Sequence, residues 1–300
     1  MSTGALLAGF IAFDAPASRR CFWQLACAPA IGAAAALGAL TAEPAWLAVA
    51  TMTVFASVIG LDVAVSPRLS VAGLTVVLAL LLGQGLSVSP SDAPEALLLG
   101  AAGAALQSAV TAVGILRRSG AVDSSPGPTA GAAAAAVRAS LDRRSPSLHH
   151  GLRWGIALGI GTAAYHLVDL GPHGYWIPLT VLFVLRPTPG ETSERIAMRA
   201  VGTIAGIALA TPLAELLGMH AVPDAIAIWI AAGFSFALLA IEYGLFTAAI
   251  TAYVVLVAHA LGQSAFEAAD ERALATAAGL AIAAAMILAW KAAPATAAAA

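Results

Sequence analysis

Long apolar stretches separated by short polar breaks dominate the pattern of this 300-residue chain. A helix needs about 20 mostly apolar residues to cross a bilayer, and most of the stretches reach or approach that length. The pattern predicts about four spans before a polar linker and about six after it. The predicted spans are residues 21–40, 45–65, 69–88 and 95–116 before the linker, and 151–168, 175–185, 196–217, 225–241, 245–261 and 273–290 after it.

Residues 119–150 differ in character from the apolar stretches. Residues 124–131 are rich in Pro, Gly and Ser, which is typical of a linker, and 132–144 predict a short basic helix on the cytoplasmic surface. The predicted domains are a membrane unit at 1–118, this linker, a membrane unit at 151–291 and a disordered tail at 292–300. Residues 1–16 lack a basic leader, so we expect them to lie along the inner interface rather than to form a signal peptide.

Composition supports a protein dissolved in lipid. Hydrophobic residues make up 60% of the chain and charged residues only 10%, with a mean hydropathy of +0.90, whereas soluble domains average about 25% charged residues. The predicted fold class is therefore an all-α, polytopic transmembrane helix bundle in contact with the lipid bilayer. A formal net charge of −2 gives no indication of a nucleic-acid partner.

The charged residues sort to opposite sides when the N-terminus is placed inside the cell. The acidic residues Glu43, Asp92, Asp169 and Asp224 then fall in outer loops, and Arg272 is the one basic residue predicted outside. This distribution follows the positive-inside rule and predicts a bacterial inner-membrane protein with both termini in the cytoplasm. The basic residues on or beside the inner side are Arg19, Arg20, Arg68, Arg117, Arg118, Arg138, Arg143, Arg144, Arg153, Arg186, Arg195, Arg199 and Lys291.

The two halves show a loose internal similarity. Each begins with a basic segment and a helix, and then has a helix that opens near a tryptophan, Trp46 in the first half and Trp176 in the second. Both units start from the inside, so the pattern predicts two parallel-related repeat units of unequal length rather than an inverted pair.

Three arginines near two prolines are the candidate substrate-binding residues. Arg186, Arg195 and Arg199 follow an apolar run, and a guanidinium pairs bidentately with a carboxylate, so they could gather an organic acid from the cytosol. The alternative is that they only anchor the topology. Tyr175 and Trp176 could stack on an aromatic substrate, or could belong to an interfacial aromatic belt.

Ionisable groups inside predicted spans are candidates for proton coupling because each is costly at membrane depth. Asp62 lies in the second span and Glu242 separates the eighth from the ninth; the alternative is that both are interfacial and pair with nearby arginines. The small residues of Gly202-x-x-x-Gly206 and Gly155-x-x-x-Gly159 predict close helix packing, and the same residues could form a sliding surface.

Metal binding and disulfide formation are both disfavoured by the sequence. His166, Asp169 and His173 have helical spacing, but Gly171-Pro172 predicts that the helix ends first. Cys21 and Cys27 lie on different faces of one predicted helix, beyond bridging distance. We therefore expect no metal site and no disulfide.

Enzymatic function is also disfavoured. Ser235 followed by His259 on the next span is similar to intramembrane serine proteases, but Phe236 stands where those enzymes need a small residue. Ser235 is better explained as a hydrogen-bond donor between helices. The chain has no P-loop and no GxGxxG motif in context, so we expect no nucleotide cofactor and no ATP-driven pumping.

A group of residues after position 174 resembles the fusaric acid resistance family, whose members are also called aromatic acid exporter-like proteins. The resemblance covers roughly residues 145–291. It implies an integral membrane secondary transporter or efflux component for small aromatic or organic acids, with a homo-oligomer or a periplasmic adaptor as further partner. The residues that carry the resemblance are Tyr175-Trp176, Leu179-Thr180, Arg186-Pro187, Thr192, Arg195, Arg199 and Gly202-Thr203-x-x-Gly206, and more weakly Tyr243, Thr247, Glu271-Arg272, Thr276 and Gly279.

The sequence is compatible with two functions from different classes. One is export of a small organic acid by proton coupling, which we infer because no ATP site is present. The other is a non-transporting membrane scaffold or accessory subunit, in which the polar groups only fix the topology.

Overall fold

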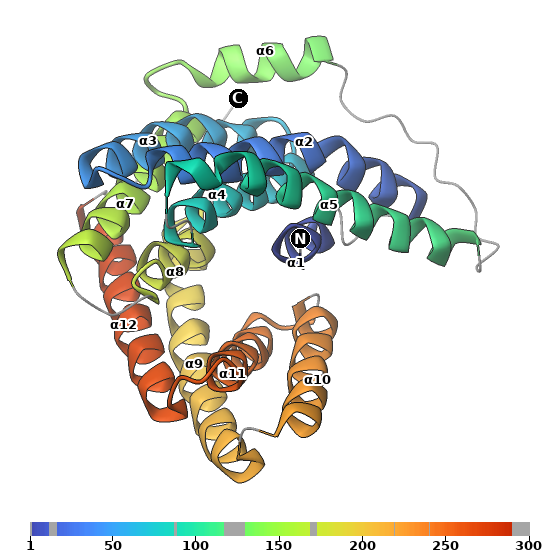
Figure 1. The fold of residues 1–300 in the computed structure, drawn as a ribbon. Helices are drawn as coiled ribbons and strands as arrows, with labels where there is room; N and C mark the ends of the chain where they lie inside the picture. The colour runs from blue at the N-terminus through green and yellow to red at the C-terminus, as the bar shows by residue number, and fades with distance from the viewer. Residues whose placement is uncertain are drawn as a thin grey trace. The chain divides into compact units, whose positions relative to one another are not determined.

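The computed structural model describes residues 2–11, 17–86, 89–116, 130–168, 173–218, 220–239 and 241–289 (Figure 1). Helices dominate these ranges, which contain no strand, and the predicted all-α fold is confirmed. The helices are α1 (Ser2–Phe10), α2 (Ala17–Thr41), α3 (Ala45–Ile59), α4 (Pro67–Leu86), α5 (Ala93–Leu116), α6 (Ala130–Ser140), α7 (Pro146–Leu167), α8 (Trp176–Val184), α9 (Pro189–Leu217), α10 (Ala221–Leu239), α11 (Tyr243–Ala260) and α12 (Ala265–Ala289), with 3₁₀ turns η1 (Gly60–Ala64) and η2 (Pro90–Asp92).

Eight helices in the described part of the chain are long and apolar enough to cross a membrane. They account for eight of the ten predicted spans. The other two are α7, which carries three histidines and Arg153, and α8, which has only nine residues. The eight candidate spans are Arg19–Thr41, Ala45–Ala64, Leu69–Leu86, Pro90–Gly114, Pro189–Leu217, Ala221–Leu239, Tyr243–Ala260 and Ala265–Ala289.

The first compact unit is Met1–Leu167. Within it α2 packs against α4 and α5, and α3 packs against α7. The first helix, α1, packs on α5, with Leu7, Ala8 and Ile11 almost fully buried. The apolar face of α1 is therefore covered by helix α5.

The second compact unit is Val168–Ala300. Its central helix, α9, packs against α11 and α12, while α8 packs on α12 and α10 on α11. The predicted C-terminal membrane unit began at residue 151, whereas α7 packs on α3, so the boundary between the units falls one helix later along the chain.

Small residues bring the helices of each unit close together. A Cβ atom added at Gly206 would lie 2.5 Å from the carbonyl oxygen of Ala248 on α11, and one added at Gly202 would meet the carbonyl oxygen of Gly244. In the first unit, Gly155 and Gly159 of α7 lie against α3 in the same way. Lipid supplies no hydrophobic force between helices, so these backbone approaches provide packing contacts instead.

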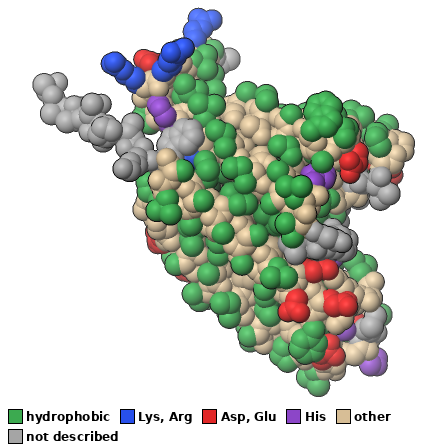
Figure 2. Space-filling model, turned by 90° about the vertical axis from the view of Figure 1, so that its left-hand side faces the viewer, with side chains coloured by type: hydrophobic (Ala, Val, Ile, Leu, Met, Phe, Trp, Pro, Cys, Tyr) green, Lys and Arg blue, Asp and Glu red, His purple; other side chains and the backbone are tan. Residues whose placement is uncertain are grey.

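The surface of the protein is largely apolar. Figure 2 shows a face over which hydrophobic side chains are spread widely and charged side chains are confined to a few places. Large hydrophobic side chains are strongly exposed, including Trp229 and Leu216, which are 82% and 83% exposed. A surface of this kind suits a lipid environment.

The basic helix α6 ends at Ser140 rather than at residue 144.

Candidate functional site

The turn between α8 and α9 fixes the position of Arg186. Thr188 caps α9 by accepting a hydrogen bond from the backbone N–H of Glu191 (3.3 Å), and Pro189 occupies the first helical turn, where its missing N–H costs nothing. The buried hydroxyl of Thr192 accepts a bond from the backbone N–H of Arg186 (3.0 Å) and lies 2.9 Å from the carbonyl oxygen of Thr188. The predicted break in the helix is thus observed at the two prolines.

Arg195 and Arg199 lie within a helix rather than in this turn. The predicted span began at residue 196, but α9 begins at Pro189. Only Arg186 of the three predicted arginines belongs to the turn. The start of the span was predicted too late, because the polar residues 191–195 form the first turns of a long helix.

Arg186 and Arg195, which we call the half-buried arginines, lie near Tyr243. The Arg195 guanidinium carbon is 4.1 Å from the centroid of the Tyr243 ring, a distance at which a cation is attracted by the ring face. Burial, and then the neighbouring charge of Arg195, lower the pKa of Arg186 to about 10. Arg186 therefore stays positively charged near neutral pH.

Arg199 and Arg272, which we call the buried arginines, lie deeper in the unit. They are 1% and 2% exposed and are among its largest fully buried side chains. The helices that carry them, α9 and α12, pack against each other. The guanidinium carbon of Arg199 lies 5.9 Å from the Phe183 ring centroid, and that of Arg272 lies 5.0 Å from the Trp176 ring centroid.

The predicted position of Arg272 was wrong. It was predicted to be the one arginine in an outer loop, because the last span was predicted to start at residue 273. Helix α12 instead begins at Ala265, so Arg272 lies on its third turn and faces the inside of the unit. Arg272 belongs to a row of buried residues at helical spacing that includes the small residues Ala265, Ala268 and Ala275. This spacing in the sequence could have predicted that Arg272 lies on the buried face of a helix.

Four helices of this unit repeat one arrangement of side chains. Each presents a large aromatic or cationic residue and, four positions later, a buried threonine. Residues at i and i+4 share one face of a helix, so both side chains point into the same interior. The pairs are Trp176 and Thr180 on α8, Arg199 and Thr203 on α9, Tyr243 and Thr247 on α11, and Arg272 and Thr276 on α12.

Several polar atoms in this interior have no hydrogen-bond partner among the described residues. They include Nε and Nη2 of Arg199 and Nε of Arg272. Four hydroxyl groups also lack a partner there, those of Thr203, Tyr243, Thr247 and Thr276. The Thr180 hydroxyl, in contrast, donates to the carbonyl oxygen of Trp176 (3.0 Å). Buried polar groups are nearly always hydrogen-bonded, so this concentration of unsatisfied donors indicates a site for a ligand.

Tyr175 and Trp176 are both buried, at 8% and 4% exposure, and neither lies on the surface as a belt residue would. The ring of His173 stacks on Trp176 with centroids 4.4 Å apart, and Nδ1 of His173 lies 2.7 Å from the carboxylate of Glu271. Because Arg272 also packs on Trp176, the indole ring holds the guanidinium in place from one side of the cluster.

The two predicted proton sites, Asp62 and Glu242, belong to different units, and only Glu242 shares a unit with these arginines. Asp62 belongs to η1 of the first unit, where its carboxylate lies against Gly73 of α4. Glu242 belongs to the second unit and caps α11: its two carboxylate oxygens accept hydrogen bonds from the backbone N–H groups of Gly244 (2.8 Å) and Leu245 (2.5 Å).

Replacing Glu242 with alanine should lower the free energy of unfolding by about 1 kcal/mol, because two amide donors at the start of α11 lose their acceptor. Glutamine keeps one acceptor oxygen and should cost less. Thermal unfolding of the purified variants measures both effects, with Glu215→Ala, an exposed carboxylate on α9, as the control. Equal stability of Glu242→Ala and wild type would show that the cap contributes nothing.

The remaining residues singled out in the sequence are His166, Asp169, His173 and Ser235. No group of metal-binding side chains occurs in the described ranges; His166 and His173 belong to different units, and Asp169 lies outside those ranges. The hydroxyl of Ser235 donates to the carbonyl oxygen of Ala231 on its own helix (2.8 Å), so it does not form the predicted bond between helices.

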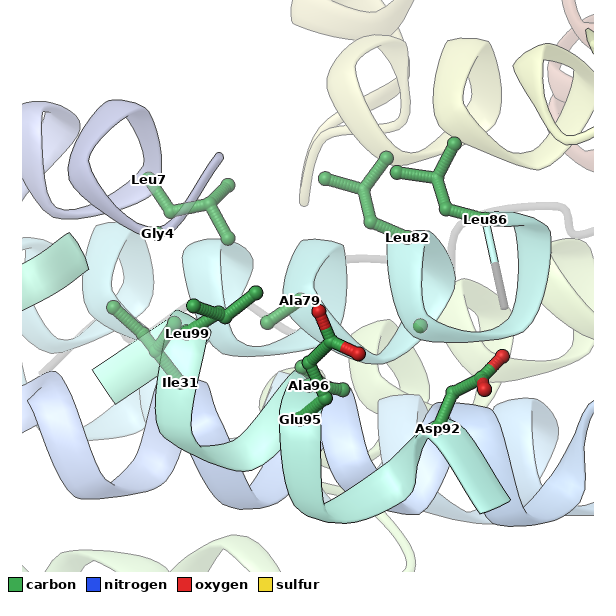
Figure 3. A pocket seen from close by; sticks show the side chains of 13 residues that line it. Gly4, Leu7, Ile31, Ala79, Leu82, Leu86, Asp92, Glu95, Ala96 and Leu99 are labelled. Atoms are coloured by element: carbon green, nitrogen blue, oxygen red, sulfur yellow. The ribbon is translucent and has the colours of Figure 1, made fainter. Parts of the chain in front are cut away.

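The first unit contains a pocket of about 300 Å³ between α1, α2, α4 and α5 (Figure 3). Its wall is mostly apolar, with Leu7, Ile31 and Leu82, and the carboxylates of Asp92 and Glu95 lie at its side. Asp92 also closes a capping box by accepting the backbone N–H of Ser89 (2.9 Å). None of the predicted site residues lines this pocket.

Comparison with known proteins supports the resemblance inferred from the sequence. Residues 156–286 match the family model described as fusaric acid resistance protein-like. Inner membrane protein YccS of Escherichia coli is 34% identical over 140 residues, which are 46% of this chain and 19% of YccS. An uncharacterized protein of Synechocystis is 40% identical over 63 residues, 21% of this chain and 8% of that protein. The uncharacterized protein YhfK of Escherichia coli is 36% identical over 78 residues, 25% of this chain and 11% of YhfK.

The matched segments span less than a fifth of each of these curated relatives. No solved structure matches the chain. The eight apolar helices and the match to an inner membrane protein together support a multi-pass inner-membrane protein. All four arginines of the site lie within the matched residues 156–286, and this half of the chain is similar to the fusaric acid resistance protein-like family.

Proposed function

We propose that the protein is a secondary transporter, or an efflux component, that exports small organic acids, with aromatic acids as the predicted substrate class. The observation that carries the proposal is that four arginines lie half-buried or buried inside one apolar helix unit. A cationic interior is expensive in a membrane protein and marks the path of an anion. The family resemblance points to the same class of substrate.

The half-buried arginines would collect the acid at the cytoplasmic side, with both termini in the cytoplasm as the charge pattern predicts. Arg186 and Arg195 are near Tyr243, and Tyr175 and Trp176 add aromatic surface further in. An anion would pass from this pair to Arg199 and Arg272. The small-residue contact of α9 with α11, at Gly202 and Gly206, would allow the helices to slide during that passage.

Efflux of labelled 4-hydroxybenzoate from liposomes that contain the purified protein tests the proposal. Arg195→Gln should lower the flux about tenfold, because it removes one charged hydrogen-bonding group from the path. The matched control is Arg138→Gln on the exposed helix α6, which should transport like wild type. Failure of every acid in a broad panel to move would favour the alternative, a scaffold or accessory subunit.

Proton coupling is tested with the same liposomes. Flux should rise when a pH gradient is imposed, and Asp62→Asn together with Glu242→Gln should abolish that rise if either carboxylate carries the proton. The cap formed by Glu242 favours a structural role for that residue, so the single variant Asp62→Asn is the more informative of the two. A gradient-driven flux that survives both substitutions would contradict coupling through these residues.

A further inference from the structure

We infer that the buried arginines, Arg199 and Arg272, form an internal binding site for the carboxylate of an aryl monocarboxylic acid. The inference rests on the proposed function and specifies where within the second unit the acid would be held. It concerns a different pair of side chains from the half-buried arginines, and one member, Arg272, was not among the residues predicted from the sequence.

The electrostatic argument starts from the absence of a counterion. Each guanidinium is almost fully buried, and no carboxylate is bonded to either within the described part of the chain. Burying a charge without a partner is strongly unfavourable, and here two such charges lie on helices that pack against each other, α9 and α12. A carboxylate placed between them would supply the missing counterion and accept hydrogen bonds from Nε and Nη2 of Arg199 and Nε of Arg272.

Hydroxyl groups from three helices would complete the site. The hydroxyls of Thr203, Tyr243 and Thr276 are buried and have no partner among the described residues. Threonine in a helix commonly donates to the carbonyl oxygen four residues earlier, as Thr180 does, so hydroxyls that do not are available to a ligand. A carboxylate offers about four acceptor positions, more than two guanidinium groups need.

The walls of the site select for an aromatic acid. Phe183, whose ring lies below the Arg199 guanidinium, has its centroid 6.4 Å from that of Phe246, and Trp176 lies beside Arg272. An aryl ring would pack against these side chains in offset or edge-to-face geometry. Chloride, sulfate and phosphate have no apolar body with which to use that surface, so we expect them to bind far more weakly than benzoate.

Binding of benzoate to the purified protein tests the site directly. At 100 times its Kd, benzoate should raise the Tm of wild type by roughly 5 °C or more, whereas benzyl alcohol, the neutral analogue, should not. Arg272→Gln and Arg199→Gln should each weaken benzoate binding, measured by calorimetry, by at least about 30-fold. Arg272→Lys keeps the charge but loses the planar guanidinium group, so its affinity for benzoate should lie between those of wild type and Arg272→Gln.

The stability of the ligand-free variants separates a binding role from a structural one. Removing a buried charge that lacks a counterion should leave the Tm of ligand-free Arg272→Gln equal to that of wild type or raise it. A variant with a lower Tm and an unchanged Kd for benzoate would overturn the inference, because Arg272 would then be a structural residue. Equal stabilisation of wild type by sulfate, or none by any aryl acid, would also overturn it.

The inference and the proposed function can fail separately. Benzoate that binds with the predicted dependence on Arg199 and Arg272, but does not cross liposome membranes, would leave the site standing and remove transport. Flux that stays at the wild-type level in Arg199→Gln and Arg272→Gln would leave transport standing and remove the site. Arg138→Gln serves as the control in both assays.

Discussion

Replacing Gly206 with leucine should prevent α9 from packing on α11 and should unfold much of the second unit. Even a single Cβ atom at this position would lie 2.5 Å from the carbonyl oxygen of Ala248, and Thr251 stands at 2.7 Å. The obstacle includes backbone, which cannot rotate away, so the helices would have to separate. We expect a loss of about 3 kcal/mol or more in the free energy of unfolding, and Gly206→Ala should show a smaller loss.

The matched control is Gly233→Leu on α10, where an added Cβ would meet nothing within 4 Å. That variant should keep the stability of wild type. Heating followed by size-exclusion chromatography with tryptophan detection is a suitable measurement. Thiol-reactive dyes would report on the wrong unit, because Cys21 and Cys27 both lie on α2 of the first unit. A stable, monodisperse Gly206→Leu variant would contradict the close contact of α9 with α11.

Replacing Trp176 with alanine should have the second large effect. The indole is 4% exposed and carries both the stacked ring of His173 and the guanidinium of Arg272. Its removal would leave a cavity among α8 and its neighbours and would lower the free energy of unfolding by about 3 kcal/mol. Benzoate binding should weaken as well, because Arg272 loses the surface that positions it.

Trp229→Ala on α10 is the control for this substitution. Trp229 is 82% exposed on the outer surface of its helix, so its removal should change stability by no more than about 0.5 kcal/mol. Trp176→Phe keeps an aromatic face and should recover part of the benzoate affinity. An equal loss of stability in the variants of Trp176 and Trp229 would contradict the special role of the buried ring.

The spans were predictable because lipid leaves few alternatives for an apolar segment of sufficient length. The ends of the helices were less predictable. Helix α9 begins at Pro189 and α12 at Ala265, in each case before the predicted start of the span. Both extensions carry charged residues that hydropathy assigns to loops, among them Arg195 on α9 and Arg272 on α12, yet Arg272 points into the unit rather than toward lipid or water.

The candidate site was predicted in part. The family resemblance and the basic segment identified Arg186, Arg195 and Arg199, but composition gave no reason to bring Arg272 into the same interior. The repeated spacing of a large residue and a threonine four positions later was present in the sequence, for example at Tyr243 and Thr247. It becomes meaningful only when the helices are seen to face one another, since one such pair alone is common.

The short length of α8 has a consequence for the energetics of transport. Nine residues of helix span about 13 Å, less than half of a hydrocarbon layer of about 30 Å, and Trp176 at its start contacts Arg272. An anion that passes this site on its way out of the cell crosses the transmembrane voltage. Each 100 mV of inside-negative potential is worth about 2.3 kcal/mol per monovalent anion expelled, or about a 50-fold concentration ratio. Export through this unit would therefore carry an electric current and could be driven by voltage even without a pH gradient.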